Sequence, residues 1–180
     1  MTCTVAYQGG PGAFAEEACR LFLPDCLAVA RASFADVAEA VRAGETGLGM
    51  LPCENSSVGA VPGISELIER NGLTVRGLHA LPVRLHLMAR PGVTLKEVKI
   101  AVSHPMALAQ SATTLQWLGL DTEEAANTAL AAQSIRASGD RTRAAIASES
   151  AAAAYGLTIL RRDVHDRPDN ATIFCVVARH

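Results

Sequence analysis

Short apolar runs alternate with helical patterns along nearly the whole chain, and this alternation limits the possible folds more than any other feature. The runs Thr4–Tyr7, Leu27–Ala30 and Leu48–Leu51 have the length of buried strands. A helical pattern follows each of the first two, and Pro24 and Gly44 end these patterns. Alternating strands and helices predict an α/β protein whose strands pair largely in parallel.

A β-rich interruption divides the chain into two halves. Residues 73–89 are extended, with no helical pattern between them, and we interpret them as a crossing between two lobes. Beyond it we expect strands at Lys99–Ser103, Thr122–Ala126, Arg143–Ala147 and Thr172–Val177, and helices at Pro105–Leu118, Thr128–Ser138 and from Ser148.

Faint internal repetition supports two similar lobes. The stretch Val5–Ala13 matches Ile100–Ala107 in type, and Gly49–Ser56 matches Ala144–Ser150. This predicts a two-lobed, periplasmic-binding-protein-like fold, with a cleft between two α/β subdomains joined by hinge strands. Subdomain 1 would cover about residues 1–77 plus 160–180, and subdomain 2 about residues 80–158.

Composition excludes several classes of function. Of 180 residues, 49% are hydrophobic, which is enough for a substantial core. A net charge of -2 and a pI near 6.2 give no reason to expect nucleic acid as a partner. No apolar run approaches the roughly 20 residues of a membrane helix, and the amino terminus does not resemble a signal peptide. We therefore expect no membrane partner and a cytoplasmic location.

The cysteines and histidines suggest no metal site. The cysteines are five in number, form no Cys-x-x-Cys pair and mostly lie in apolar patterns: Cys3, Cys19, Cys26, Cys53 and Cys175. We expect them to be buried thiols in a reducing compartment. The five histidines lack metal-ligand spacing, so we expect no metal.

One polar stretch stands out as a candidate ligand site. The apolar run Leu48–Leu51 leads into Glu54, Asn55 and Ser56, before a new helical pattern begins. In open α/β sheets, ligands bind at the carboxyl ends of the strands, where these side chains would lie. The simpler interpretation is that these residues form a turn and cap the next helix.

Other polar residues lie at expected element ends. Gly9–Gly12 leaves backbone N–H groups at a helix start, where the helix dipole favours an anion. Ser103, Gln110, Thr128 and Thr172 add hydroxyls and an amide, although singly they fit helix caps, a solvated amide and a β-former. No nucleophile elbow or Ser-His-Asp pattern is evident. As a set, they suit an anionic small molecule better than hydrolysis.

Six segments together resemble the prephenate dehydratase family. In chain order they are Gly10–Glu17, Pro52–Ser56 with Gly59, Ser103–Gln110, Asn127–Ala132, Ala145–Ser148 with Tyr155–Leu157, and Asn170–Phe174. The resemblance spans nearly the whole chain and implies two α/β lobes with a cleft and hinge strands. It also implies a lyase of phenylalanine biosynthesis that turns prephenate into phenylpyruvate, carbon dioxide and water without a cofactor.

The resemblance also implies roles for individual residues. Thr172 would be catalytic, as a hydrogen-bond donor to the leaving oxygen, and Glu54 could share proton delivery if it is buried. The expected substrate-binding residues are Asn55, Ser56, Ser103, Gln110 and Thr128. Relatives associate through this domain, so we expect a homodimer. Prephenate and its amino analogue arogenate both remain possible substrates.

Two features depart from the family pattern. Ile173 stands where the family usually has arginine, so Arg84, Arg161 or Arg162 would have to meet the substrate charge. Most relatives continue into a phenylalanine-binding ACT regulatory domain, whereas this sequence stops at His180, and we expect no ACT domain in it. Two alternative functions stay open: a prephenate decarboxylase-like enzyme, and a non-catalytic two-lobed sensor of small anions.

Overall fold

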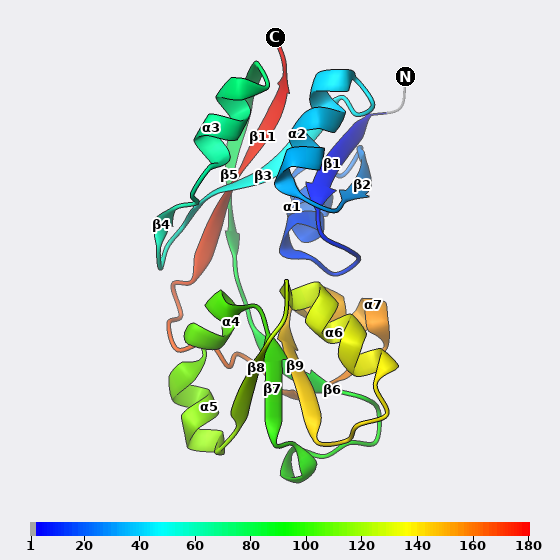
Figure 1. Ribbon diagram of the computed structural model, residues 1–180, viewed down its shortest axis with the longest axis vertical. Coiled ribbons are helices and arrows are strands. Elements are labelled where there is room, and N and C mark those ends of the chain that lie inside the picture. The colour runs from blue at the N-terminus through cyan, green and yellow to red at the C-terminus, as the bar shows by residue number, and fades with distance from the viewer. Residues whose placement is uncertain (1–2) are drawn as a thin grey trace. The chain divides into compact units, whose positions relative to one another are not determined.

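The computed structural model describes residues 3–180, which form two compact α/β units (Figure 1). The first unit comprises residues 3–10, 14–83 and 169–180, and the second comprises residues 11–13 and 84–168. Each unit has its own sheet with helices on both faces. The predicted α/β class is confirmed. Among the described residues, no helix has the length and apolar character needed to span a bilayer.

The sheet of the first unit is mixed and has the strand order β2-β1-β3-β11-β5, with β4 paired to β3. The strands β1, β2 and β3 run parallel, and β11 lies antiparallel between β3 and β5. The elements are β1 (Thr4–Gln8), α1 (Phe14–Phe22), β2 (Leu27–Arg31), α2 (Phe34–Ala43), β3 (Leu48–Asn55), β4 (Gly59–Ala60), α3 (Ile64–Arg70), β5 (Leu73–Pro82) and β11 (Ala171–Arg179).

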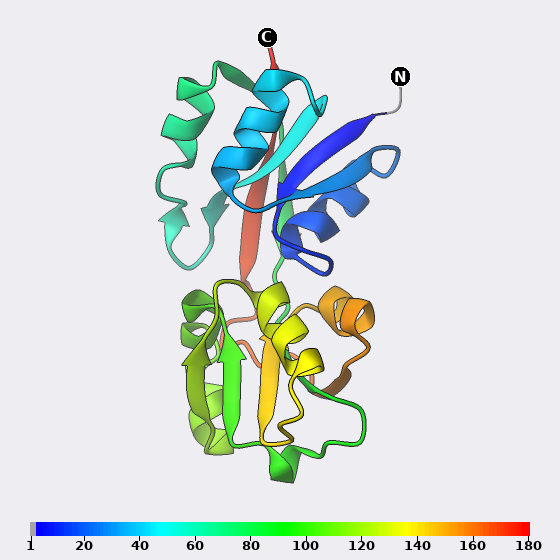
Figure 2. The same ribbon diagram turned by 45° about the vertical axis from the view of Figure 1, so that its right-hand side comes forward.

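Alternation along the strands directs side chains into two core layers of this unit. Ala6, Leu51 and Cys175 point toward α2 and α3, where they join one buried cluster. Helix α1 covers the other face, as Figure 2 shows, and buries its Ala18 and Cys19. A capping box formed by Ser33 and Asp36 starts α2.

The sheet of the second unit has the order β10-β6-β9-β7-β8. The strands β7, β8 and β9 are parallel, whereas β6 runs antiparallel to both β9 and β10. The elements are β6 (His86–Ala89), the 3-10 helix η1 (Leu95–Glu97), β7 (Ile100–Ser103), α4 (Pro105–Ala109), α5 (Ala112–Leu118), β8 (Asp121–Glu124), α6 (Thr128–Ala137), β9 (Arg143–Ala147), α7 (Glu149–Tyr155) and β10 (Thr158–Arg161).

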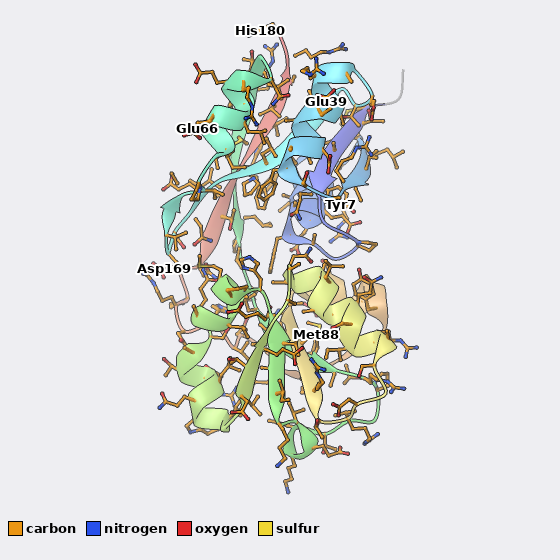
Figure 3. The ribbon with its side chains drawn as sticks, in the orientation of Figure 1. Tyr7, Glu39, Glu66, Met88, Asp169 and His180 are labelled. Atoms are coloured by element: carbon orange, nitrogen blue, oxygen red, sulfur yellow. A yellow bond between two sulfur atoms is a disulfide. The ribbon has the colours of Figure 1, made fainter. Side chains whose placement is uncertain are left out.

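Alanine dominates the core of the second unit and lets its helices approach the sheet closely. Met88, labelled in Figure 3, packs with Val102 and Ile135 in a buried cluster that α6 and α7 cover. The helix α4 contacts β7, β8 and β9, and its Leu108 is buried. Strand alternation therefore sorts the apolar side chains of this unit into two layers, as it does in the first.

The single helix predicted over Pro105–Leu118 is wrong, because the structure has two helices that break after Gln110. The Gln110 carbonyl accepts the N–H of Asp166 at 2.7 Å. The Asp166 carboxylate in turn accepts the N–H groups of Thr113 (3.0 Å) and Thr114 (3.2 Å) in the first turn of α5. A residue more than fifty positions away thus ends one helix and starts the next, which local periodicity could not show.

The prediction of five buried thiols is wrong for four cysteines, which form the disulfides Cys3–Cys26 and Cys53–Cys175. Parallel pairing of Thr4 with Leu27 brings together the residues that precede them, Cys3 and Cys26. Cys19 stays a free, fully buried thiol, and burial raises its pKa to about 12. Strand register decides which cysteines form disulfides, and this register cannot be read from the sequence alone.

We expect alkylation to distinguish the free thiol of Cys19 from the four disulfide-bonded cysteines. Without reductant, iodoacetamide should add no label to the folded protein, because Cys19 is buried and protonated, and one label to the denatured protein. With reductant, the denatured protein should take five labels, read by intact mass. Five labels without reductant would contradict both disulfides.

Candidate functional site

The edge of the first sheet at which β1, β2 and β3 end carries four predicted site residues. Because β11 runs antiparallel to β3, its first residues meet the last residues of β3 at this edge. Glu54 and Asn55 end β3, Ser56 follows it, and Thr172 lies near the start of β11. The carboxyl ends of parallel strands are where α/β proteins bind small ligands.

Asn55 and Thr172 form the central contact of this edge. They are direct partners in the β3–β11 register, so their side chains share one face of the sheet. Asn55 Nδ2 donates to Thr172 Oγ1 at 3.0 Å, while Asn55 Oδ1 accepts the N–H of Ser57 at 2.9 Å. The Thr172 hydroxyl therefore accepts from Asn55 and keeps its own hydrogen for another acceptor. Thr172 is 9% exposed, so its hydroxyl is held in a largely desolvated position.

Ser56 contacts the chain next to Thr172. Its N–H donates to the Ala171 carbonyl at 2.9 Å, and its Oγ accepts the Ala171 N–H at 3.0 Å. The structure thus places Ser56 beside the predicted catalytic threonine and bonds it to backbone.

Glu54 lies one residue from this contact but in a different environment. It pairs in register with Ile173 and with Ala60 of β4, and its side chain is exposed. Successive strand residues point to opposite faces, so Glu54 does not share the face of Asn55 and Thr172. The structure therefore does not show the burial on which proton delivery by Glu54 depends, and a catalytic role for Glu54 stays a prediction.

Three further predicted residues belong to the second unit. Ser103 ends β7 fully buried and donates through Oγ to the Ile146 carbonyl at 2.6 Å, so its hydroxyl joins β7 to β9. Gln110 is half-buried at the end of α4, and Thr128 is half-buried at the start of α6. The structure thus brings together Asn55, Ser56 and Thr172 and places Ser103, Gln110 and Thr128 in the other unit.

The helix caps in the second unit differ from those predicted. His104, rather than Ser103, caps α4 through Nδ1, and Asn127, rather than Thr128, caps α6 through an oxygen that accepts the Leu130 N–H at 2.7 Å. Thr128 is therefore in the first turn of α6, at the positive end of the helix dipole. This leaves its hydroxyl free of the capping role.

Packing against α7 requires a glycine at position 12 of the Gly9–Gly12 turn. Gly12 has φ 82°, and a Cβ there would lie 2.4 Å from Cα of Ala151 in α7. The Gly12 carbonyl accepts the Ser148 hydroxyl at 2.6 Å, and Ser148 Oγ also caps α7 by accepting the Ala151 N–H. Only glycine fits this position, because positive φ and a close backbone approach coincide.

Arg84, Arg161 and Arg162 were the candidates to meet the substrate charge in place of the family arginine at position 173. In the structure, each of them contacts another side chain of the second unit. Arg84 lies 3.4 Å from the carboxylate of Asp163, and Arg162 lies 2.8 Å from that of Glu149. The Arg161 guanidinium lies 4.8 Å from the centroid of the Trp117 ring. A surface hollow of about 440 Å³ between α7 and β10 includes Arg161 and Arg162 but none of the predicted site residues.

Asp166 and His86 stabilise the fold of the second unit, and no sequence pattern predicts these roles. Asp166 lies in the charged segment after β10, which showed no periodicity. His86 is 3% exposed, and its Nδ1 accepts the Asp163 N–H at 3.0 Å. Burial lowers the pKa of His86, which favours the neutral ring that this contact needs.

Comparison with known proteins gives the family. The prephenate dehydratase family model matches residues 5–180. A bifunctional N-acyl-homoserine lactone acylase/prephenate dehydratase of Komagataeibacter europaeus is 39% identical over 97% of this chain and 62% of its own length. An arogenate dehydratase/prephenate dehydratase of Arabidopsis thaliana is 41% identical over 97% of this chain and 46% of its own. This chain therefore spans less than two thirds of both relatives.

Solved structures agree. The prephenate dehydratase of Arthrobacter aurescens, solved in complex with L-Phe, is 30% identical and superposes with a TM-score of 0.90 over 98% of this chain and 60% of its own. A putative methionine-binding lipoprotein of Bacillus subtilis shares the fold at 11% identity, with a TM-score of 0.52 over 98% of this chain and 83% of its own. The periplasmic-binding-protein-like fold is therefore confirmed, and the chain belongs to the prephenate dehydratase family.

Proposed function

We propose that this chain catalyses the decarboxylating dehydration of prephenate to phenylpyruvate. The observation that carries the proposal is the hydrogen bond from Asn55 to Thr172, which holds a hydroxyl with a free hydrogen at the ligand-binding edge of a sheet. Family membership supplies the reaction class. The reaction has no redox step, so the protein has to orient the substrate and donate hydrogen bonds to it.

The reaction breaks two bonds on opposite sides of a ring. The carboxylate carbon leaves as carbon dioxide, and the electron pair of that bond enters the ring. The ring becomes aromatic as the C–O bond breaks, and its electron pair leaves with the oxygen as hydroxide. The Thr172 hydroxyl donates a hydrogen bond to that departing oxygen, where negative charge develops in the transition state.

Asn55 prepares Thr172 for this role. Its amide donates to Thr172 Oγ1, which fixes the rotamer of the hydroxyl and polarises its O–H bond. Thr128 lies in the first turn of α6, where a helix start favours an anion, and its role in substrate binding stays a prediction. Each of these assignments is part of the proposal.

Rival reactions are separated by product. The relatives named above include enzymes that act on arogenate and one named as an acylase, so arogenate and an N-acyl-homoserine lactone belong in the same assay. Phenylpyruvate or phenylalanine formed from the two cyclohexadiene substrates supports the dehydratase. A non-aromatic dihydro product would indicate a decarboxylase, and binding without product a sensor.

We expect Thr172→Ala to lower kcat by about 10²- to 10⁴-fold, because it removes the donor to the leaving oxygen. Thr172→Ser keeps the hydroxyl and should retain most of the activity. Alkaline absorbance of phenylpyruvate measures turnover, and thermal unfolding checks the fold. Near-normal turnover of Thr172→Ala would remove this residue from the mechanism.

Asn55→Asp tests the direction of the hydrogen bond. A carboxylate cannot donate, so it would accept from Thr172 and draw the hydroxyl hydrogen away from substrate. We expect kcat to fall by about 10- to 100-fold. We also expect it to fall below that of Asn55→Ala, in which no acceptor competes. The opposite order of the two variants, in steady-state assays of equally folded protein, would contradict the proposed role.

Self-association is a finer part of the proposal. We infer a homodimer that uses the edge strand β5, whose Val75 and Leu78 are 43% and 64% exposed. Long exposed edge strands with apolar side chains readily pair with another chain. In analytical ultracentrifugation we expect the wild-type protein to sediment as a dimer and Leu78→Lys to shift the equilibrium toward the monomer. A wild-type protein that is monomeric at micromolar concentration would contradict the proposed dimer. Location in the cytoplasm stays a prediction.

A further inference from the structure

We propose that Ser56 is a positioning residue, which holds Thr172 through the backbone of Ala171, and not a ligand of the substrate. This inference rests on the proposed function, because it concerns the same site and assigns a different task to one of its residues. The structure carries it through two hydrogen bonds that join Ser56 to a single residue, Ala171.

The need for Ser56 follows from the strand ladder. In an antiparallel sheet, each residue of a central strand turns both backbone polar groups toward the same neighbour, and successive residues alternate sides. At the start of β11, the Asn170 carbonyl faces β5 and accepts the Val83 N–H at 2.8 Å. Ala171 must therefore bond on the β3 side.

On that side, β3 has already ended. Asn55 is its last residue, and the chain turns at Ser56 and Ser57. Ser56 still supplies an N–H to the Ala171 carbonyl at 2.9 Å, but the backbone carbonyl that a longer strand would offer is replaced by Ser56 Oγ, at 3.0 Å from the Ala171 nitrogen. The side chain thus completes the ladder by one residue beyond the strand.

The position of this extension matters for chemistry. Ala171 directly precedes Thr172, so the Ser56 contact fixes the backbone on one side of the catalytic hydroxyl. The Asn55 amide fixes the hydroxyl itself at 3.0 Å. Hydrogen bonds to a departing oxygen depend steeply on distance and angle, and small misplacements of a catalytic group can reduce rates up to about 10²-fold.

Ser56 is also exposed, so an effect of its substitution on catalysis can be told apart from an effect on the stability of the fold. In Ser56→Ala, water can replace Oγ as the partner of the Ala171 N–H, so the folded state loses little. The Ala171 N–H loses its fixed partner, however, because a water molecule has no fixed place, and only the bond from the N–H of residue 56 to the Ala171 carbonyl remains. The variant should therefore fold normally and react slowly.

The experiment compares Ser56→Ala, Ser56→Thr and the control Val58→Ala, an exposed neighbour on the same turn. We expect Ser56→Ala to lower kcat for prephenate about 10-fold with KM within about 2-fold of wild type, since ground-state binding is unchanged. Ser56→Thr keeps the acceptor oxygen and should restore kcat. Val58→Ala should leave both constants unchanged.

Hydrogen exchange gives a readout that does not depend on turnover. The Ala171 amide should exchange at least about 10-fold faster in Ser56→Ala than in wild type, and at the wild-type rate in Ser56→Thr. A rise in KM at constant kcat would show that Ser56 binds substrate and would overturn the proposal. Unchanged exchange at Ala171 would overturn it as well.

The two hypotheses fail differently. If wild type turns over neither prephenate nor arogenate, the proposed function is wrong, and the exchange rate of Ala171 alone then decides whether Ser56 restrains this segment. If wild type is active but Ser56→Ala matches it in kcat, the dehydratase assignment stands and the positioning role falls.

Discussion

The pairing of the last strand with the third is the constraint on which the candidate site depends. Residue 172 reaches residue 55 across 117 positions of sequence only because β11 returns to the first unit and enters its sheet between β3 and β5. Ladder hydrogen bonds on both sides of β11 hold it in register. The contact between Asn55 and Thr172 is therefore a property of sheet topology, since the two residues are far apart in the sequence.

Local sequence signals were sufficient for much of the fold. Glycine and proline end signals, the capping box at Ser33 and the strand-like runs lie where the structure has the corresponding elements, because these signals act within one turn or one strand. Failures arose where a distant partner decides the local structure. Asp166 divides a continuous helical pattern into α4 and α5, and strand register converts four cysteines into two disulfides.

The environments of the predicted site residues could not be read from the sequence. Family resemblance pointed to Asn55, Ser103 and Thr172, but hydrogen-bond geometry gives them distinct environments. Asn55 donates to Thr172 at the sheet edge, while the Ser103 hydroxyl is buried and bonded to the Ile146 carbonyl. Burial and direction of donation are three-dimensional quantities, so a residue type in a motif cannot reveal them.

The irregularity in β3 has a consequence for how this protein can change. In the β3–β11 register, Ile173 opposes Glu54 and Phe174 opposes Pro52, so Cys53 is an extra residue in the bulge. Deletion of one residue there would remove the bulge. The side chains of Glu54 and Asn55 would then point to the opposite faces of the sheet from those they face now, while the residues before the bulge would keep their faces. Substitutions in this segment have graded effects, whereas a change in its length is all-or-none. The number of residues from Leu51 to Asn55 therefore determines which side chains face the site, whereas a substitution within this segment leaves that arrangement in place.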